Sequence, residues 1–187
     1  MYRNFVKPLL DFIISFILII VFSPLMLIVL IITVIDLGFP IHNLIRQREG
    51  KNRKTFIMYK FRTKALDKDG TTNSNTYTKV SRFIDKTRLN ELPQLFNVLI
   101  GQMSLVGPRP FIPYEADEFR DQINEKRYLV RPGLTGLAQV NGGRTISQTK
   151  KLEYDAIYYD NMSFMLDLTI ILRTIVQTFS KGIDSKK

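Results

Sequence analysis

The sequence predicts a mainly α-helical fold with a small extended or β element, attached to an N-terminal membrane helix. Three observations predict this fold. Residues 12–35 carry no charged side chain, residues 55–61 alternate partly between apolar and polar, and much of the remainder has amphipathic patterning broken by glycine and proline. At 187 residues, the chain fits one globular unit with an appended membrane segment. We therefore expect a membrane part at 1–37 and a second domain at 38–187.

The apolar run is long enough to cross a bilayer. It has about 24 residues, against the roughly 20 that a spanning helix needs, and it is too long for a secretory signal peptide. Ser23 and Pro24 lie near its middle, where proline removes a backbone hydrogen bond and bends a helix. Both flanks are basic, as is typical of cytoplasmic flanks. A kinked spanning helix and a re-entrant helix that returns to the same face both fit this pattern.

The composition limits the partners and the metal chemistry. The chain has 27 Lys and Arg against 17 Asp and Glu, a formal net charge of +10, which suits an anionic partner. Next to an apolar run, we expect anionic membrane lipids to be such a partner. The sequence shows no recognition helix and no basic aromatic stacking surface, so we expect no nucleic-acid partner. With no cysteine and only His42, a metal must use oxygen ligands, which suits Mg²⁺ or Mn²⁺.

The globular part divides into short predicted elements. The C-terminal segment Met162–Lys181 fits either a buried core helix or a helix at the membrane surface. The other predictions are an extended segment at Thr55–Phe61, a loop at Asp67–Thr78, a helical region at Arg82–Ile100 with a boundary near Asn90 and Pro93, a rigid turn region at Gly101–Pro113, a helix at Tyr114–Tyr128, a glycine-rich loop at Val130–Gly143 and a helix at Ser147–Asp160.

Five motifs occur in order along the chain, and together they resemble one family. They are Ser23-Pro24, Lys60-Phe61-Arg62-Thr63, Asn90-Glu91-Leu92-Pro93-Gln94-Leu95, Met103-Ser104-Leu105-Val106-Gly107-Pro108-Arg109-Pro110 and Val130-Arg131-Pro132-Gly133-Leu134-Thr135-Gly136. The series is similar to the bacterial sugar transferases, the small monotopic phosphoglycosyl transferases, and it covers nearly the whole chain.

The resemblance implies a location and a reaction. It implies a re-entrant membrane helix broken at Ser23-Pro24, with interfacial amphipathic helices and a catalytic domain on the cytoplasmic face of the bacterial inner membrane. The implied reaction moves a sugar 1-phosphate from a UDP-sugar to polyprenyl (undecaprenyl) phosphate and releases UMP. This would be the first membrane step of glycoconjugate, capsule or exopolysaccharide assembly. The family uses Mg²⁺ and an Asp-Glu dyad, whose aspartate holds a covalent phosphosugar.

Carried over residue by residue, the resemblance implies a site. Asn90 and Glu91 take the dyad positions and are the expected catalytic residues and metal ligands. Because both substrates are anionic, the site needs cations and polar groups that hold phosphate. The expected phosphate-binding residues are Lys60, Arg62, Arg109, Arg131, Gly133, Thr135 and Gly136. Each of these residues can also have a purely structural role. The roles are a solvated strand face, a rigid linker, a turn or, for Asn90 and Glu91, the start of a helix.

Position 90 departs from the family pattern. The family has aspartate there, whereas a carboxamide is a poor nucleophile and a weaker magnesium ligand. The lesser departures are Asp85 for an arginine, Lys64 for a methionine and Gln102 for an acidic residue. Three explanations of Asn90 stay open. The chain belongs to an active branch of the family that uses Glu91 or direct transfer, or it is a variant that traps a complex. The third is an impaired relative that binds nucleotide sugar or polyprenyl phosphate as a membrane scaffold. From sequence alone, Asn90→Asp is expected to increase transfer. The sugar and the oligomeric state are not encoded in any motif.

Overall fold

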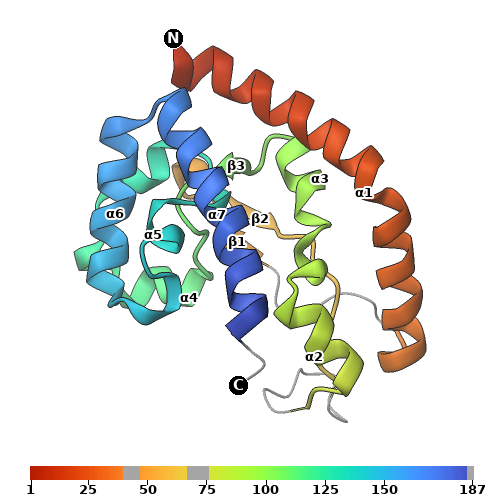
Figure 1. Ribbon diagram of the computed structural model, residues 1–187. Coiled ribbons are helices and arrows are strands. Elements are labelled where there is room, and N and C mark those ends of the chain that lie inside the picture. Colours follow the sequence, from red (N-terminus) through yellow and green to blue (C-terminus); the bar gives the residue numbers. More distant parts are fainter. Residues whose placement is uncertain (40–46, 67–75, 185–187) are drawn as a thin grey trace.

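The computed structural model describes residues 1–39, 47–66 and 76–184, without the side chains of Arg144 and residues 179–184. Most of the predicted loop at 67–78 lies outside these ranges. Within them the fold is mainly helical with two small sheets, as predicted (Figure 1). The α-helices are α1 (Lys7–Leu37), α2 (Lys79–Lys86), α3 (Gln94–Leu99), α4 (Pro113–Glu118), α5 (Leu137–Val140), α6 (Gln148–Asn161) and α7 (Phe164–Asp184). The strands are β1 (Gln47–Glu49), β2 (Thr55–Ile57), β3 (Ser104–Val106) and β4 (Gly133–Thr135).

Helix α1 is a single long apolar helix, which follows a π-helical turn at Tyr2–Val6. It is the one helix among the described residues that is long and apolar enough to cross a membrane. Pro24 lies inside it, and the Ser23 hydroxyl donates to the Ile20 carbonyl at 2.9 Å. Figure 1 shows α1 as a bent arc along one side of the molecule. The long apolar helix is therefore confirmed, but it continues through Ser23 and Pro24, so the implied break appears as no interruption of the helix.

A buried polar cluster fastens the start of α1 to the remainder of the fold. Lys7 Nζ donates to Asp167 Oδ2 of α7 at 2.7 Å, and the Tyr2 hydroxyl donates to the same oxygen at 2.6 Å. The Tyr158 hydroxyl lies 2.8 Å from Asp167 Oδ1, and Asp11 Oδ1 accepts the Leu105 amide of β3 at 3.0 Å. Lys7, Asp11 and Asp167 are all buried, so these charges depend on one another.

The end of α1 is fastened to the same body by other contacts. Arg62 donates from Nη2 to the Leu37 carbonyl at 2.5 Å and to the Gly38 carbonyl at 2.8 Å. The hydroxyl of Thr78, the N-cap of α2, donates to Asp36 Oδ2 at 2.6 Å. Both ends of the apolar helix are thus attached to the globular part, and α1 does not project away from it (Figure 1).

Three glycines allow close approach of the chain around the parallel β3–β4 pair. A Cβ atom on Gly107 would lie 2.4 Å from the Arg131 carbonyl oxygen. One on Gly133 would lie 2.1 Å from the Gly107 nitrogen, and one on Gly136 would lie 2.1 Å from the Gly107 carbonyl oxygen. Real Cβ atoms do not approach backbone so closely. The glycines of these two motifs are therefore required by packing.

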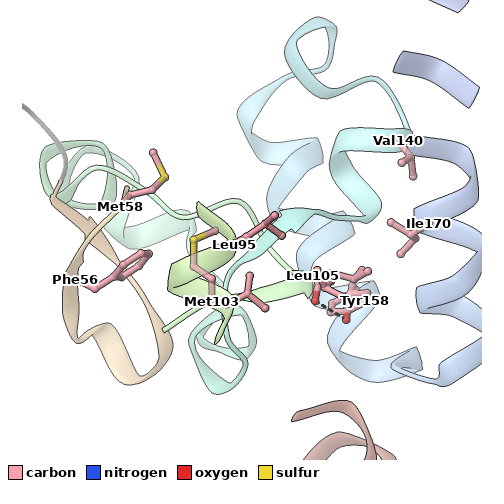
Figure 2. Packing of buried hydrophobic residues seen from close by; sticks show 10 residues of the cluster. Phe56, Met58, Leu95, Met103, Leu105, Val140, Tyr158 and Ile170 are labelled. Carbon is pink, nitrogen blue, oxygen red and sulfur yellow. Dashed lines mark hydrogen bonds between the residues drawn. The ribbon is translucent and has the colours of Figure 1, made fainter. Parts of the chain in front are cut away.

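The core lies between α3, the β3–β4 pair, α6 and α7. Figure 2 shows its side chains, which come from many parts of the chain. They are Phe56, Met58, Leu95, Val98, Met103, Leu105, Val106, Val140, Tyr158 and Ile170. Partly buried residues of α1, among them Ile14 and Leu18, pack against the same cluster. The inner face of α1 thus shares the core of the globular part.

Several predicted elements are confirmed and others are wrong. The helical region at Arg82–Ile100 is present as α2 and α3, and its predicted boundary is the 3-10 turn Leu89–Glu91. Residues 148–161 are helical as predicted. The predicted helix at Tyr114–Tyr128 is wrong, because it is short α4 followed by two 3-10 turns. The predicted turn regions hold β3, β4 and α5, which are too short to produce a periodic pattern.

Candidate active site

Backbone pairing brings two of the predicted site motifs together. The Phe61 amide donates to the Asn90 carbonyl at 2.9 Å, so the segment after β2 runs beside the turn Leu89–Glu91. Lys60 Nζ then lies 3.4 Å from Glu91 Oε1. Asn97 of α3 supports this arrangement, because it accepts the Tyr59 amide at 2.8 Å. Lys60 and Glu91, which belong to separate motifs, are therefore neighbours in the structure.

Glu91 lies among several cations. Arg88 Nη1 is 3.5 Å from Glu91 Oε2, and Arg88 has the left-handed conformation (φ 58°) in which α2 ends. Burial alone would raise the pKa of Glu91, but Lys60, Arg88 and Arg109 together lower it below its ordinary value. The Glu91 side chain keeps 23% exposure. This carboxylate therefore stays ionised and reaches solvent.

Arg109 connects this cluster to a second arginine. The pKa of Arg48, in β1, is lowered first by burial and then by repulsion from Arg109. Arg109 itself is exposed, and its carbonyl accepts from Arg127 Nη2 at 2.6 Å, which fixes the backbone of the Pro-Arg-Pro turn. Lys60, Arg88 and Arg109 are the cations that act on Glu91, and Arg48 interacts with Arg109 and with the carboxylate of Glu115. We call Lys60, Arg88, Arg109, Arg48 and Glu91 the Glu91 cluster, and its surplus positive charge suits a polyanion.

Asn90 is buried and holds a neighbouring carboxylate. It has 1% exposure, and its Nδ2 donates to Asp85 Oδ1 at 2.8 Å. The same Asp85 oxygen accepts the Thr63 hydroxyl at 3.2 Å. The other amide atom, Asn90 Oδ1, is buried without a hydrogen-bond partner among the described residues. Two departures from the family pattern, at positions 85 and 90, are therefore in direct contact.

Arg62 has a different role from the predicted phosphate contact. It has 1% exposure, and its guanidinium is occupied by the carbonyls at the end of α1 and by the Lys64 carbonyl at 3.2 Å. The free carbonyls at a helix C-terminus attract a cation for both hydrogen bonding and the helix dipole. Arg62 thus caps α1, and the prediction that it binds substrate is corrected.

Arg62→Met is expected to lower the free energy of unfolding by about 3 kcal/mol, because several hydrogen bonds from a charged donor are lost while the carbonyls stay in place. Arg62→Lys keeps the charge but not the planar fork, so its loss should be smaller. Thermal unfolding in detergent, followed by circular dichroism, measures both. Equal stability of the Met variant and the unchanged protein would show that the cap contributes nothing.

The remaining predicted residues lie in the tightly packed β3–β4 region. The Gly133 amide donates to the Pro108 carbonyl at 2.9 Å, and the Thr135 hydroxyl lies 2.6 Å from that of Thr174 in α7. The guanidinium of Arg131 faces Gly101, at the end of α3, and the structure describes no contact between it and Glu91. Gly136 packs against Gly107. A phosphate contact by Arg131 stays a prediction, whereas the Gly133 amide is already engaged.

The site includes residues that sequence reasoning did not select. Neither Arg48 nor Arg88 belongs to the five motifs, and Asp85 enters the sequence analysis only as a departure from the family pattern. The spacing of Arg88 from Glu91 (i, i+3) is a signal that was available, since such pairs are neighbours on a helical turn. The contact between Asp85 and Asn90 depends on how α2 ends, which no local pattern encodes.

The oxygen atoms of Glu91 and Asn90 suit a hard cation such as Mg²⁺ better than a softer metal. Among the described residues, no three His, Cys, Asp or Glu side chains are grouped as metal ligands. Mg²⁺ does not need such a group, because it binds one or two carboxylates together with waters and substrate phosphates. Glu91 and the unpartnered Asn90 Oδ1 are oxygen donors of this kind.

Comparison with known proteins agrees with the motifs. The family model described as bacterial sugar transferase matches residues 2–181. A UDP-glucose:undecaprenyl-phosphate glucose-1-phosphate transferase of Klebsiella pneumoniae is 39% identical over 187 residues, which is 92% of this chain and 40% of the relative. An undecaprenyl-phosphate galactose phosphotransferase of Salmonella typhimurium is 34% identical, over 91% of this chain and 40% of the relative.

A shorter relative is matched over a larger share of its own length. The uncharacterized sugar transferase EpsL of Bacillus subtilis is 43% identical over 141 residues, 73% of this chain and 69% of that protein. The chain spans about two fifths of the length of the Klebsiella and Salmonella relatives, with 40% covered in each. The ordered motifs, the clustering of Lys60, Glu91 and Arg109, and the match over residues 2–181 agree: the chain belongs to the bacterial sugar transferase family.

Proposed function

We propose that this chain transfers a sugar 1-phosphate from a UDP-sugar to undecaprenyl phosphate, giving undecaprenyl-diphospho-sugar and UMP. The observation that carries the proposal is the Glu91 cluster, in which an ionised carboxylate lies among three cations, with Arg48 next to one of them, beside an apolar helix. Relatives over more than nine tenths of the chain are named for this reaction with glucose and galactose. We place the reaction at the first membrane step of capsule, exopolysaccharide or other glycoconjugate assembly.

The cations of the cluster supply the electrostatics that phosphoryl transfer needs. Lys60 and Arg109 would neutralise the diphosphate of the donor, and Arg48 would share that charge from β1. A bound diphosphate would also relieve the repulsion between Arg48 and Arg109 that lowers the pKa of Arg48. Glu91 is held between Lys60 and Arg88, which fixes its position at the edge of this anion site.

We propose that Mg²⁺ is the cofactor, held by Glu91 and by the amide oxygen of Asn90 together with substrate phosphate oxygens. The ion would neutralise charge on the diphosphate. Asn90 Oδ1 suits this role because it is buried without a hydrogen-bond partner among the described residues. A metal ion would replace the interactions with water that this oxygen loses on folding. Lys60 and Arg109 would orient the donor, and the buried Asn90 side chain would exclude water from one side of the site.

We propose further that α1 is re-entrant and that the domain at 38–187 lies on the cytoplasmic face of the bacterial inner membrane. Support comes from the attachment of both ends of α1 to the same globular body, through Asp167 at one end and Arg62 at the other. If α1 crossed the bilayer, the polar body that meets both of its ends would have to lie on both sides of the membrane. The net charge of +10 would favour anionic lipid headgroups.

Exposed apolar side chains indicate which helices would enter the membrane. On α1 they are Phe12, Ile13, Phe16, Ile17, Ile20, Val21, Leu27, Ile28 and Ile31. On α7 they are Phe164, Met165, Leu168, Leu172, Ile175 and Val176, while Asp167 and Ile170 of the same helix are buried. Helix α7 is thus apolar on both its inner and outer faces. We propose that its outer face lies at the membrane interface.

The topology can be tested by cysteine labelling, because the chain has no native cysteine. We expect Asn4→Cys and Lys54→Cys, at exposed positions before and after α1, both to resist a membrane-impermeant maleimide in intact cells. Both should label after the membrane is permeabilised, which is the control for reactivity. Labelling of Asn4→Cys alone in intact cells would establish a spanning helix.

Arg109→Ala is expected to weaken binding of a UDP-sugar by about 1.5–3 kcal/mol, the range for hydrogen bonds to charged groups. Arg120→Ala is the matched control, because Arg120 is equally a surface arginine but pairs with Asp117 outside the Glu91 cluster. Isothermal titration with the donor measures both. Unchanged donor affinity in a folded Arg109→Ala protein would remove Arg109 from the anion site.

The proposed activity is tested with purified chain, Mg²⁺, undecaprenyl phosphate and three sugar-labelled donors, UDP-glucose, UDP-galactose and UDP-N-acetylgalactosamine. These are the sugars in the names of relatives. We expect label to enter the lipid extract with at least one donor, and only when undecaprenyl phosphate is present. Label that enters without the acceptor lipid would indicate a contaminating activity.

A second candidate function is a membrane scaffold that binds nucleotide sugar or undecaprenyl phosphate without turnover. The observation that favours it is Asn90, since the family pattern has a nucleophilic aspartate at this position. Donor binding with no transfer to lipid from any of the three donors would support the scaffold. The intact cation cluster around Glu91 is the reason that we place the transferase first.

A further inference from the structure

The contact between Asp85 and Asn90 places a carboxylate where the sequence pattern alone shows none. Asn90 Nδ2 donates to Asp85 Oδ1 at 2.8 Å, so the acidic group lies one hydrogen bond away from the amide at position 90. Asn90 is next to Glu91 in the same 3-10 turn. Asp85 thus belongs to the site geometrically although it lies in α2.

The orientation of the Asn90 amide is set by this carboxylate. An ionised carboxylate only accepts hydrogen bonds, so the Nδ2 end of the amide must face Asp85. That orientation leaves Asn90 Oδ1 buried and without a partner among the described residues, in a side chain with 1% exposure. Buried unsatisfied atoms are rare in native structures and need an explanation. The contact of Nδ2 with Asp85 therefore leaves Oδ1 as the amide atom without a partner among the described residues.

The partners of the two carboxylates differ. Glu91 is paired with Lys60 and Arg88, and these cations withdraw its charge. Within the described part of the chain, the hydrogen-bond donors to Asp85 are the neutral groups of Asn90, Thr63 and Tyr77, and no ion pair there includes Asp85. A carboxylate held only by neutral donors keeps more of its negative charge available for attack.

The two oxygens of Asp85 also differ. Oδ1 accepts from Asn90 at 2.8 Å and from Thr63 at 3.2 Å, which fixes the carboxylate plane. Among the described residues, Oδ2 accepts from the Tyr77 hydroxyl alone, at the long distance of 3.5 Å. Asp85 is partly exposed, whereas Asn90 is buried. Oδ1 is therefore anchored, and Oδ2 is the less engaged of the two oxygens.

We propose that Asp85 is the catalytic nucleophile of this chain and that Asn90 positions it. The inference rests on the proposed transferase function. Asp85 Oδ2 attacks the phosphorus that carries the sugar, and the bond from that phosphorus to the bridging oxygen breaks. UMP leaves with that oxygen and its electron pair, and an aspartyl phosphosugar remains. An oxygen of the lipid phosphate then attacks the same phosphorus, which breaks the bond to Asp85 and regenerates the carboxylate.

The test locates the adduct in the unchanged protein. The full chain is incubated with Mg²⁺ and each of the three UDP-sugars without lipid acceptor, treated with hydroxylamine to convert an acyl phosphate into a stable hydroxamate, and digested with trypsin. Trypsin separates the candidates, since Asp85 lies in the peptide Phe83–Lys86 whereas Glu91 lies in the peptide that begins at Leu89. We expect one UMP released per chain and the hydroxamate in the peptide Phe83–Lys86.

Asp85→Asn gives a second, independent measurement. Its carbonyl oxygen still accepts from Asn90 and Thr63, so a role limited to local structure would survive the change. If Asp85 is the nucleophile, the Asp85→Asn protein should lose transfer by a factor on the order of 10³ or more. Asp121→Asn is the matched control, because Asp121 is exposed and lies outside the site, and its transfer should be unchanged.

The outcomes separate this inference from the proposed function. A hydroxamate on Glu91, or Asp85→Asn protein that still transfers, would overturn the role of Asp85 and leave the transferase intact. Release of UMP only when lipid acceptor is present, with no adduct, would show direct transfer and also overturn it. Absence of transfer by the unchanged protein with all three donors would defeat the proposed function itself.

Discussion

Lys7→Met is expected to lower the free energy of unfolding by about 3–5 kcal/mol, the cost of removing one partner from a buried ion pair. Lys7 lies 2.7 Å from Asp167 and 4.0 Å from Asp11, and all three side chains are buried. Without the ammonium group, two carboxylates remain in the interior with no cation between them. The start of α1 should then detach from α7 and from β3.

The matched control is Lys79→Met, at an exposed position of α2, which should change stability by no more than about 0.5 kcal/mol. Thermal unfolding of the three proteins in the same detergent, followed by circular dichroism, gives the comparison. If both variants unfold at the temperature of the unchanged protein, the cluster at the start of α1 does not hold the membrane helix to the fold.

Asn90→Asp is expected to lower transfer by about tenfold or more, since each 1.36 kcal/mol added to the barrier costs a factor of ten. The substitution replaces a donor with a second anionic oxygen 2.8 Å from Asp85 Oδ1. At an effective dielectric constant of about 20, two unit charges at this 2.8 Å separation repel by about 6 kcal/mol. Relief of the repulsion displaces Asp85 from the position that Asn90 gives it.

This expectation is the reverse of the one from sequence alone, which treats position 90 in isolation. Initial rates of lipid-linked product, measured at saturating donor, compare Asn90→Asp with the unchanged protein. Asn161→Asp, at an exposed position at the end of α6, is the control for the same chemical change elsewhere. A clear gain of transfer in Asn90→Asp would return the covalent role to residue 90.

The sequence predicted those parts of the fold that local patterns control. The run from Phe12 to Ile35 is apolar at every helical face, so α1 was predictable from length and charge alone. Helix α6 was predictable for another reason, because residues 147–160 contain no glycine or proline that would break a helix. The segment from Tyr114 to Tyr128 has helical composition, but Arg127 packs on Phe111 and the Tyr128 hydroxyl donates to Glu49, which lies far away in the chain. Its 3-10 turns follow from this packing.

The candidate site was predictable in its residue types more than in its contacts. Lys60, Glu91 and Arg109 were selected by their motifs, and the structure gathers them into one cluster. Arg62 belongs to the same motif as Lys60 and, two positions further on, would face the same side in a regular strand. Strand β2 ends at Ile57, however, and Arg62 meets the end of α1 instead. Asp85 was selected by no motif, because its contact depends on where α2 ends.

The central claim is that the sugar leaves the nucleotide together with its phosphate. It is tested most directly with a UDP-sugar that carries tritium in the uridine and ³²P in the phosphate next to the sugar, incubated with the purified chain, Mg²⁺ and undecaprenyl phosphate. We predict that ³²P enters the lipid extract while tritium stays in the aqueous phase as UMP. Recovery of both labels in water as UDP, with sugar alone on the lipid, would contradict the account.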